Sequence, residues 1–192
     1  MYTDVKRCVD AVLSLAAIIV MWQIICIIAA AVWLDNPGPI LFRQRRLGMG
    51  GRYFDILKFR TMRTDAPKDV PTHQLKNPEQ YVTRVGRLLR RTSLDELPQL
   101  YNILVGDMSI VGPRPALWNQ YDLISIRERT NVNDIRPGLT GLAQIKGRDE
   151  LPIKVKAKYD AIYKRNESLW LDTAIIALTI RQVIAGAGIK GR

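Results

Sequence analysis

An uncharged run near the start of the chain limits the possible folds more than any other feature. Residues 11–34 are 24 consecutive positions without a charged side chain, and most of them are apolar. As an α-helix the run would extend for ~36 Å, which exceeds the ~30 Å hydrocarbon core of a bilayer. The sequence therefore predicts a membrane-inserted helix, which we assign to residues 1–35.

A cleaved secretory signal and a buried core helix both fit this run less well. A secretory signal has a shorter apolar region followed by small residues at a cleavage site, whereas here Asp35-Asn36-Pro37-Gly38-Pro39 follows. A buried core helix of a small domain is rarely this long without a charge. The remaining residues, 36–192, are enough for one compact domain outside the membrane.

The charges on either side of the run leave its topology open. Lys6-Arg7 precede it and three arginines follow within residues 43–46, so positive charge gives no bias for a single crossing. A helix that enters the bilayer and returns to the same face would place both clusters in the cytoplasm. Trp22-Gln23 lie near the middle, where Gln23 could hydrogen-bond backbone groups freed by a bend. No proline or glycine interrupts the run, so a bend remains a hypothesis.

The composition indicates an anionic partner. The chain of 192 residues has 29 Lys and Arg against 18 Asp and Glu, for a formal net charge of +11. Nucleic acid, anionic lipid headgroups and a phosphorylated substrate all fit this surplus. Cys8 and Cys26 lie in or beside the apolar run and do not suggest a disulfide framework, which fits a reduced cytosolic setting.

Beyond the run, the pattern predicts a small sheet among several helices. We expect a strand pair at 40–46 and 53–62, a surface loop at 63–78, helices at 80–91 and after Pro152, and an interfacial or core helix at 169–184. A stiff loop rich in glycine and proline at 105–118 presents Arg114, and a further loop at 134–141 holds Arg136. The lone His73 falls in the surface loop and receives no role.

Adjacent carboxylates, Asp95-Glu96, stand out in this basic chain. Ser93 with Glu96 three positions later has the form of a capping box, while proline favours the first helical position, so a helix begins at Leu94 or Pro98. One carboxylate could attack phosphorus while the other holds a divalent cation. An ordinary helix cap with acidic residues in its first turn is the alternative, and it is the commoner arrangement in proteins.

Several basic side chains are held on turns or beside proline and glycine. They are Lys58, Arg60, Arg114, Arg136 and Arg148. One arginine side chain can donate two parallel hydrogen bonds to the oxygens of a phosphate group. A solvated basic face against anionic lipids is the alternative, and it would use the same residues. The sequence contains no Walker-type loop, dinucleotide fingerprint or Cys/His cluster. The residues alone therefore predict a membrane-anchored domain that binds phosphorylated ligands.

Nearly the whole chain resembles a known family. The blocks that carry the resemblance are Lys6-Arg7 with Asp10, 37–40, Gln44 with Arg46, 58–62, 91–99, 106–115, 136–141, and Gln144 with Gly147-Arg148. In this order they resemble the bacterial sugar transferase family, the monotopic phosphoglycosyl transferases, in its small catalytic-domain form.

The resemblance implies a two-step transfer. In this family an aspartate attacks the β-phosphate of a UDP-sugar and releases UMP, and undecaprenyl phosphate then attacks the covalent sugar-phospho-aspartate. Carried over, Asp95 is the nucleophile, and Glu96 together with Asp95 is the expected Mg²⁺ site. The expected substrate-binding residues are Lys58, Arg60, Arg90 and Arg114, with Arg136 and Arg148 in loops proposed to hold the nucleotide.

The resemblance also implies a fold and a location. We expect an α/β fold, mostly helical with a small sheet, a broken re-entrant helix, and a cytoplasmic catalytic domain with interfacial amphipathic helices at the bacterial inner membrane. Membrane lipids are expected partners and nucleic acid is not; the oligomeric state stays open, a dimer being one option. Four positions depart from the family: Trp22-Gln23 replaces a frequent Ser-Pro, Leu142 a frequent Trp, and Asp149 a frequent Asn.

Two rival functions fit the same residues. A glycosyltransferase that moves only the sugar would release UDP in place of UMP. A membrane-tethered module for nucleic acid or a protein partner would use the basic face, but it lacks the aromatic interleaving of single-strand binding and gives Asp95 no task. The sequence names neither the sugar nor the glycan pathway.

Overall fold

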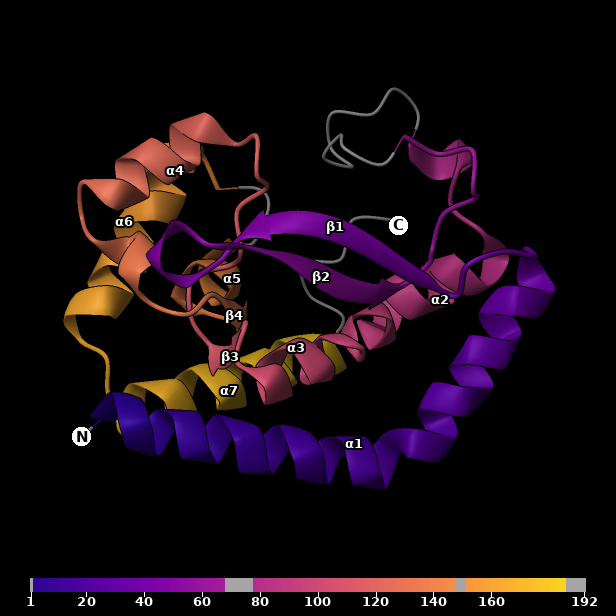
Figure 1. The fold of residues 1–192 in the computed structure, drawn as a ribbon, viewed down its shortest axis with the longest axis horizontal. Coiled ribbons are helices and arrows are strands. Elements are labelled where there is room, and N and C mark those ends of the chain that lie inside the picture. The colour runs from indigo at the N-terminus through magenta and orange to yellow at the C-terminus, as the bar shows by residue number, and fades with distance from the viewer. Residues whose placement is uncertain (1, 68–77, 148–150, 186–192) are drawn as a thin grey trace.

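Helix α1 (Tyr2–Asp35) contains the whole uncharged run without interruption in the computed structural model, which describes residues 2–67, 78–147 and 151–185. Figure 1 shows that the helix bends partway, so that its two arms run in different directions. Most of its apolar side chains are exposed, including Val20 at 74% and Leu34 at 72%. It is the one helix in the described ranges that is long and apolar enough to cross a membrane. The long apolar helix predicted from the sequence is confirmed.

Short strands and helices follow along the rest of the chain. The strands are β1 (Leu41–Leu47), β2 (Tyr53–Phe59), β3 (Ser109–Val111) and β4 (Gly138–Thr140). The helices are α2 (Arg84–Thr92), α3 (Gln99–Val105), α4 (Tyr121–Glu128), α5 (Leu142–Gly147), α6 (Ile153–Arg165) and α7 (Leu169–Ile184). The described chain is therefore mostly helical, as expected, but with two small sheets where the sequence predicted one. The division at residue 35 stays a prediction.

The N-terminal arm of α1, residues 2–14, is bound through polar side chains. Arg7 donates from its two terminal nitrogens to the carbonyl oxygens of Ile103 and Leu104, at 2.6 and 2.7 Å. The buried Asp10 carboxylate accepts from the Ser109 hydroxyl at 2.7 Å and from the Ile110 amide at 3.2 Å. Charged side chains on an apolar helix thus tie it to the end of α3 and to the start of β3.

The C-terminal arm of α1, residues 28–35, is bound mainly through apolar contacts. Ile28 and Val32 form a buried cluster with Phe59 of β2 and Leu89 of α2. The Asp35 carboxylate at the end of the helix accepts from the Val85 amide at 2.9 Å. Both arms therefore contact the same folded body, while residues 15–27 between them contain no buried side chain.

Strands β1 and β2 form the expected antiparallel hairpin. Gln44 is opposite Ile56, and Arg46 is opposite Phe54. The turn between them contains a single 3-10 turn, Met49–Gly51, in which Gly50 has φ 64°, a conformation that glycine adopts without strain. The second strand ends at Phe59, three residues earlier than the pattern predicted.

Strands β3 and β4 form a parallel pair that the sequence did not reveal. Ser109 is opposite Gly138, and Val111 is opposite Thr140. A methyl group on Gly138 would overlap the Gly112 backbone, so only glycine permits this close approach. Three-residue strands carry too little alternation to be recognised, and the two loops expected at 105–118 and 134–141 in fact contain them.

Helices α4 to α7 complete the described fold. The helices expected after Pro152 and at 169–184 are confirmed as α6 and α7, whereas α4 and α5 were not predicted. Figure 1 shows α3 and α7 beside the N-terminal arm of α1. The Lys6 ammonium lies 2.6 Å from the Asp172 carboxylate, which joins α1 to α7.

Candidate active site

The carboxylate pair lies in a tight connection between two helices. Helix α2 ends at Thr92, and Ser93 has φ 58° and donates from its amide to the carbonyl oxygens of Arg90 and Leu89. One 3-10 turn, Leu94–Glu96, then precedes α3. The Ser93 side chain caps no helix, so the capping box predicted from the sequence is wrong. The capping box does not form because Ser93 adopts a left-handed conformation that ends α2 instead of beginning the next helix. Asp95 and Glu96 therefore lie in the connection between α2 and α3.

Glu96 is held by two cations from different parts of the chain. Its Oε1 lies 2.6 Å from Lys58 Nζ on β2 and 3.2 Å from the Arg114 guanidinium on the loop after β3. Burial alone would raise the pKa of Glu96, but Lys58 and Arg114 outweigh it and hold the pKa far below its usual range. Glu96 is therefore ionised and fixed in position.

Asp95 has a different environment from its neighbour. It forms no side-chain hydrogen bond with the described residues, although Lys58, Arg90 and Arg114 all attract its charge. Burial raises the pKa of Asp95, the Glu96 charge raises it further, and the three cations oppose both effects. The result is a partly desolvated carboxylate among cations and without a fixed partner, which suits a nucleophile better than a structural role.

Arg90 reaches this site because α2 lies against the segment after β2. A methyl group on Gly86 would overlap the Thr61 carbonyl oxygen, so the two backbones can approach only at a glycine. The Arg90 Nε atom donates to the Thr61 hydroxyl at 2.8 Å. Burial lowers the pKa of Arg90, and Asp95 and Glu79 counteract the effect. Thr61 had no role in the sequence prediction, whereas in the structure its hydroxyl group orients the Arg90 side chain.

The loop that carries Arg114 is fixed by hydrogen bonds to four successive carbonyl oxygens. The donors to the oxygens of Pro113, Arg114, Pro115 and Ala116 are the Gly138 amide, Arg127 Nη1, Arg46 Nη1 and the Leu47 amide, at 2.8, 2.9, 3.0 and 3.0 Å. Prolines at 113 and 115 restrict the backbone further. The loop that the sequence predicted to be stiff is thus hydrogen-bonded at four carbonyl oxygens, by donors from β1, α4 and β4.

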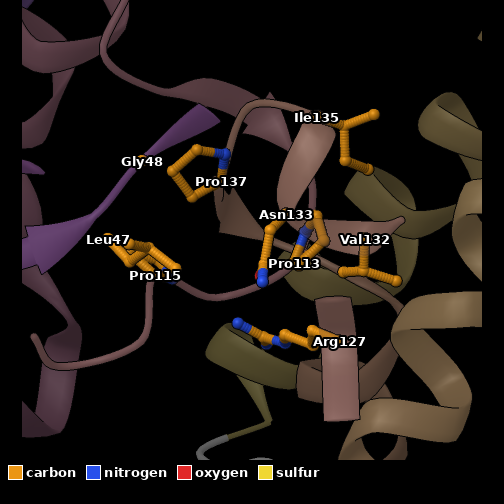
Figure 2. Close-up of a pocket in the computed structure, with 9 residues that line it drawn as sticks. All are labelled: Leu47, Gly48, Pro113, Pro115, Arg127, Val132, Asn133, Ile135 and Pro137. Atoms are coloured by element: carbon orange, nitrogen blue, oxygen red, sulfur yellow. The ribbon is translucent and has the colours of Figure 1, made fainter. Parts of the chain in front are cut away.

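Arg127 is itself fixed by a buried ion pair. Its Nε and Nη2 atoms donate to Asp160 Oδ2 at 2.9 and 2.6 Å, and both side chains are almost fully buried. Figure 2 shows Arg127 among the residues that line a small space with Pro113 and Pro115. This space measures about 10 Å³, which is room for one water molecule and not for a substrate.

Two of the predicted substrate-binding residues, Arg60 and Arg136, bind elsewhere than at the carboxylates. Arg60 is buried and donates to the Asn36 carbonyl oxygen at the turn after α1. Arg136 donates from Nε to the Gly106 carbonyl oxygen at 3.0 Å, at the end of α3 remote from Glu96. Arg148 lies outside the described residues. Lys58, Arg90 and Arg114 are the predicted residues that the structure places around Asp95 and Glu96.

Sequence reasoning missed the residues that position the site. Arg127 and Asp160 are separated by 33 positions, and nothing in the local pattern marks either as buried. Arg46 belonged to a block of the family resemblance but had no assigned role. Arg46 Nη2 donates to the side-chain oxygen of Gln44, two positions earlier on β1. Alternate residues of a strand point to the same side, so the spacing of Gln44 and Arg46 in the predicted strand could have indicated that Arg46 faces the same way as its partner.

The donor set fits a magnesium ion that is held partly by its substrate. Across 2–67, 78–147 and 151–185, no three acidic, histidine or cysteine side chains converge to form a complete metal cage. Mg²⁺ commonly takes one or two carboxylates together with water and substrate phosphates. Asp95 and Glu96 supply that number of carboxylates, so the residues present are compatible with the ion.

Sequence comparison relates this chain to known proteins over nearly its whole length. A family model described as bacterial sugar transferase matches residues 1–186. A UDP-glucose:undecaprenyl-phosphate glucose-1-phosphate transferase of Caulobacter vibrioides is 43% identical over 189 residues, covering 93% of this chain and 69% of that protein. A protein of the same name from Xanthomonas campestris pv. campestris is 42% identical over 186 residues, covering 93% of this chain.

The relatives differ in length from this chain. The chain spans 38% of the Xanthomonas protein, and so matches only part of some curated relatives. A Bacillus subtilis (strain 168) protein named uncharacterized sugar transferase EpsL is 39% identical over 185 residues, which cover 96% of this chain and 90% of that protein. The match extends over nearly all of the sequence in each comparison. The chain belongs to the bacterial sugar transferase family.

Proposed function

We propose that this chain is a phosphoglycosyl transferase that moves a sugar-1-phosphate from a UDP-sugar to undecaprenyl phosphate and releases UMP. The observation that carries the proposal is the contrast between two adjacent carboxylates: Glu96 is bound by Lys58 and Arg114, and Asp95 is unbonded among the same cations. Relatives named as UDP-glucose:undecaprenyl-phosphate glucose-1-phosphate transferases support the choice of substrates.

In the first step the Asp95 carboxylate attacks the β-phosphorus of the UDP-sugar. A bond forms between a carboxylate oxygen and phosphorus, the bond from phosphorus to the α–β bridging oxygen breaks, and UMP leaves with that oxygen. An anionic nucleophile must approach an anionic diphosphate, so the site has to remove the repulsion. Lys58, Arg90 and Arg114 supply the positive charge, and the fixed loop keeps Arg114 in place.

In the second step a phosphate oxygen of undecaprenyl phosphate attacks the same phosphorus. The bond between phosphorus and Asp95 breaks, the diphosphate-linked lipid forms, and the carboxylate is regenerated. A covalent intermediate divides one difficult transfer into two easier displacements. No redox partner is needed, and a phosphate monoester that is ionised near neutral pH needs no strong base.

We assign Asp95 and Glu96 as the residues that would hold Mg²⁺. When bound, the ion would neutralise charge on the diphosphate. Glu96 keeps a low pKa, so it remains a carboxylate ligand across the physiological range. Lys58 and Arg114 both contact Oε1 of Glu96, and within the described residues no hydrogen bond is made by the other oxygen.

We propose that α1 enters the membrane and returns to the cytoplasmic side. Both arms are bound to one folded body, through Asp10 at one end and Asp35 at the other, and the apolar residues between them are exposed. A helix that crossed would place Arg7 and Asp10 on the far side, away from the carbonyl and amide groups that they bind. The bend visible in Figure 1 fits this path.

Product analysis separates this function from its rivals. Purified protein in nanodiscs with Mg²⁺, undecaprenyl phosphate and a panel of UDP-sugars should release UMP with at least one sugar. Release of UDP would instead indicate transfer of the sugar alone. Asp95→Asn should abolish UMP release, whereas Asp107→Asn, an acidic residue outside the site, should retain it; an active Asp95→Asn variant would overturn the proposal.

A further inference from the structure

The chain continues as one right-handed coil from the carboxylate pair into α3. Leu97 and Pro98, which join the 3-10 turn to α3, have φ and ψ values in the helical region. Residues three and four positions apart lie on the same face of such a coil. Gln99 follows Asp95 by four positions and Glu96 by three. Its side chain therefore shares a face with both carboxylates.

Gln99 is a buried residue whose amide nitrogen is unused. The residue is 1% exposed, and its Nε2 atom is buried and makes no hydrogen bond within the described residues. Nearly all buried polar groups in folded proteins are hydrogen-bonded, because an unpaired group has lost its water without a replacement. An unpaired donor in this position points to a partner that it gains at another stage of the reaction.

Gln99 lies in a row of polar side chains that face β2. Three positions earlier, Glu96 contacts Lys58 on that strand at 2.6 Å. Three positions later, Asn102 accepts from the Leu57 amide at 3.0 Å and donates to a carbonyl oxygen of the same strand at 2.9 Å. Helical side chains lean toward the N-terminus, over the residues three and four positions before them. The Gln99 amide is therefore directed to the carboxylate pair and away from Asn102.

Of the two carboxylates, Asp95 is the one that lacks a donor. Glu96 already accepts from Lys58 and Arg114 through Oε1. Asp95 makes no side-chain hydrogen bond in the described part of the chain, although the cations around it attract its charge. Glutamine and aspartate four positions apart on a helix have Cβ atoms about 5–6 Å apart and can hydrogen-bond. Side-chain rotation alone can therefore join the unpaired donor to the unpaired acceptor.

We infer that Gln99 is a positioning residue for the nucleophile, and that its Nε2 atom donates to one Asp95 oxygen while the other oxygen attacks phosphorus. The inference rests on the proposed function. A bound diphosphate attracts Lys58, Arg90 and Arg114 to its own oxygens, which weakens their hold on the carboxylate. A neutral amide is attracted less strongly to the phosphates, so it can keep the carboxylate in the attacking orientation.

The same hydrogen bond assists the second step. When the acceptor phosphate attacks, the bond between phosphorus and the Asp95 oxygen breaks, and its electron pair returns to the carboxylate. Negative charge then develops on both carboxylate oxygens, and a donor at one of them stabilises it. Gln99 should therefore accelerate formation and breakdown of the covalent intermediate and contribute little to binding of the UDP-sugar.

Single-turnover kinetics of Gln99→Met in nanodiscs test the inference, because methionine has similar length and no N–H donor. We expect the rate constant for UMP release without acceptor, and that for loss of the adduct on addition of undecaprenyl phosphate, each to fall at least about ten-fold. In the steady state kcat should fall likewise, while KM for the UDP-sugar should stay nearly constant. These rate constants do not depend on the folded fraction, so a variant that folds poorly still gives an answer.

The matched control is Gln182→Met on α7. It removes an amide that donates to the Ile145 carbonyl oxygen at 2.8 Å, and it should keep both rate constants. The unfolding temperatures should differ in the opposite sense. Gln99→Met should unfold no earlier than the native protein, because it removes an unpaired amide, whereas Gln182→Met loses a hydrogen bond and should unfold slightly earlier.

Several results would overturn the inference. Native rate constants in Gln99→Met would do so directly. A raised KM at native kcat would show that Gln99 binds substrate, and slow UMP release that extra Mg²⁺ restores would assign the amide to Glu96. Failure of the native protein to form an adduct on Asp95 would overturn the proposed function together with this inference, whereas equally fast adduct formation in both proteins would overturn the inference alone.

Discussion

Arg127 holds Arg114 by the main chain: its Nη1 atom lies 2.9 Å from the Arg114 carbonyl oxygen, while the Arg114 side chain lies 3.2 Å from Glu96. One buried arginine thus fixes the position of a second, partly exposed one that faces the carboxylates. The buried partner Asp160 keeps Arg127 in place from α6. The geometry of the site depends on contacts made well away from it.

Removing Arg127 should reduce both stability and turnover. Arg127→Met leaves Asp160 buried without its partner, which typically costs about 3–5 kcal/mol of unfolding free energy. The double variant Arg127→Met/Asp160→Leu should recover much of that stability but not the bond to the Arg114 carbonyl, so kcat should stay low. Denaturant unfolding in micelles and UMP release measure the two effects. The control is Arg129→Met, which removes an exposed arginine of the same segment. If Arg127→Met matched this control in both unfolding free energy and kcat, Arg127 would not be the residue that positions the Arg114 loop.

Glu96 should make a pH-dependent contribution to stability. Lys58 and Arg114 hold its pKa below the ordinary value near 4.5 against the opposing effect of burial. A group with a lowered folded pKa stabilises fully above its unfolded pKa, and the contribution declines as pH falls toward the folded pKa. The unfolding free energy of the native protein minus that of Glu96→Gln should therefore be constant near pH 7 and decline from about pH 4.5 downward. A difference that does not change with pH would contradict the ion pairs.

The pH dependence of UMP release should report Asp95. Burial raises the pKa of this carboxyl group, and only the ionised form can attack phosphorus. Activity should therefore fall as pH is lowered through that raised pKa. Lys58 is the strongest opposing cation, so Lys58→Met should move the acid limb of kcat/KM to higher pH, while Lys58→Arg should leave it nearly in place. An acid limb that does not move in Lys58→Met would exclude Asp95 as its source.

A methyl group at position 86 should disturb the site through α2. In Gly86→Ala the new Cβ would overlap the Thr61 carbonyl oxygen, so α2 must move and carry Arg90 with it. Overpacking of this kind costs about 1–3 kcal/mol. Thermal unfolding and UMP release should both decline, whereas Leu88→Ala on the exposed face of α2 should leave stability almost unchanged. If Gly86→Ala unfolded at the same temperature as the unaltered protein, the backbones at positions 61 and 86 would be able to move apart without cost, which would contradict this prediction.

The elements that sequence predicted well are those with a long or regular pattern. Helix α1, the β1–β2 hairpin, α2 and α7 each have enough residues for apolar spacing to identify them. Strands β3 and β4 have three residues each, and their pairing depends on the contact between Gly112 and Gly138 across the fold. Local propensity cannot reveal a pair that is created by tertiary approach.

The candidate site was predictable only in part. Asp95 and Glu96 stood out because acidic residues are the minority. Lys58 and Arg114 stood out among the basic residues as candidate phosphate ligands, and Arg90 followed from the family resemblance. Arg136 was expected at the nucleotide, yet the structure shows its side chain bonded at the end of α3. Which cation faces the carboxylates depends on how β2 and the loop after β3 meet, and spacing along the chain does not contain that information.

The central claim is that Asp95 becomes covalently bonded to phosphorus. Mass spectrometry of the peptide that contains Asp95, after a single turnover with a UDP-sugar and Mg²⁺ but no lipid acceptor, tests it most directly. We expect a sugar-phosphate adduct on Asp95 that disappears when undecaprenyl phosphate is added. Stoichiometric UMP release without an adduct on that peptide, or an adduct on another residue, would contradict it.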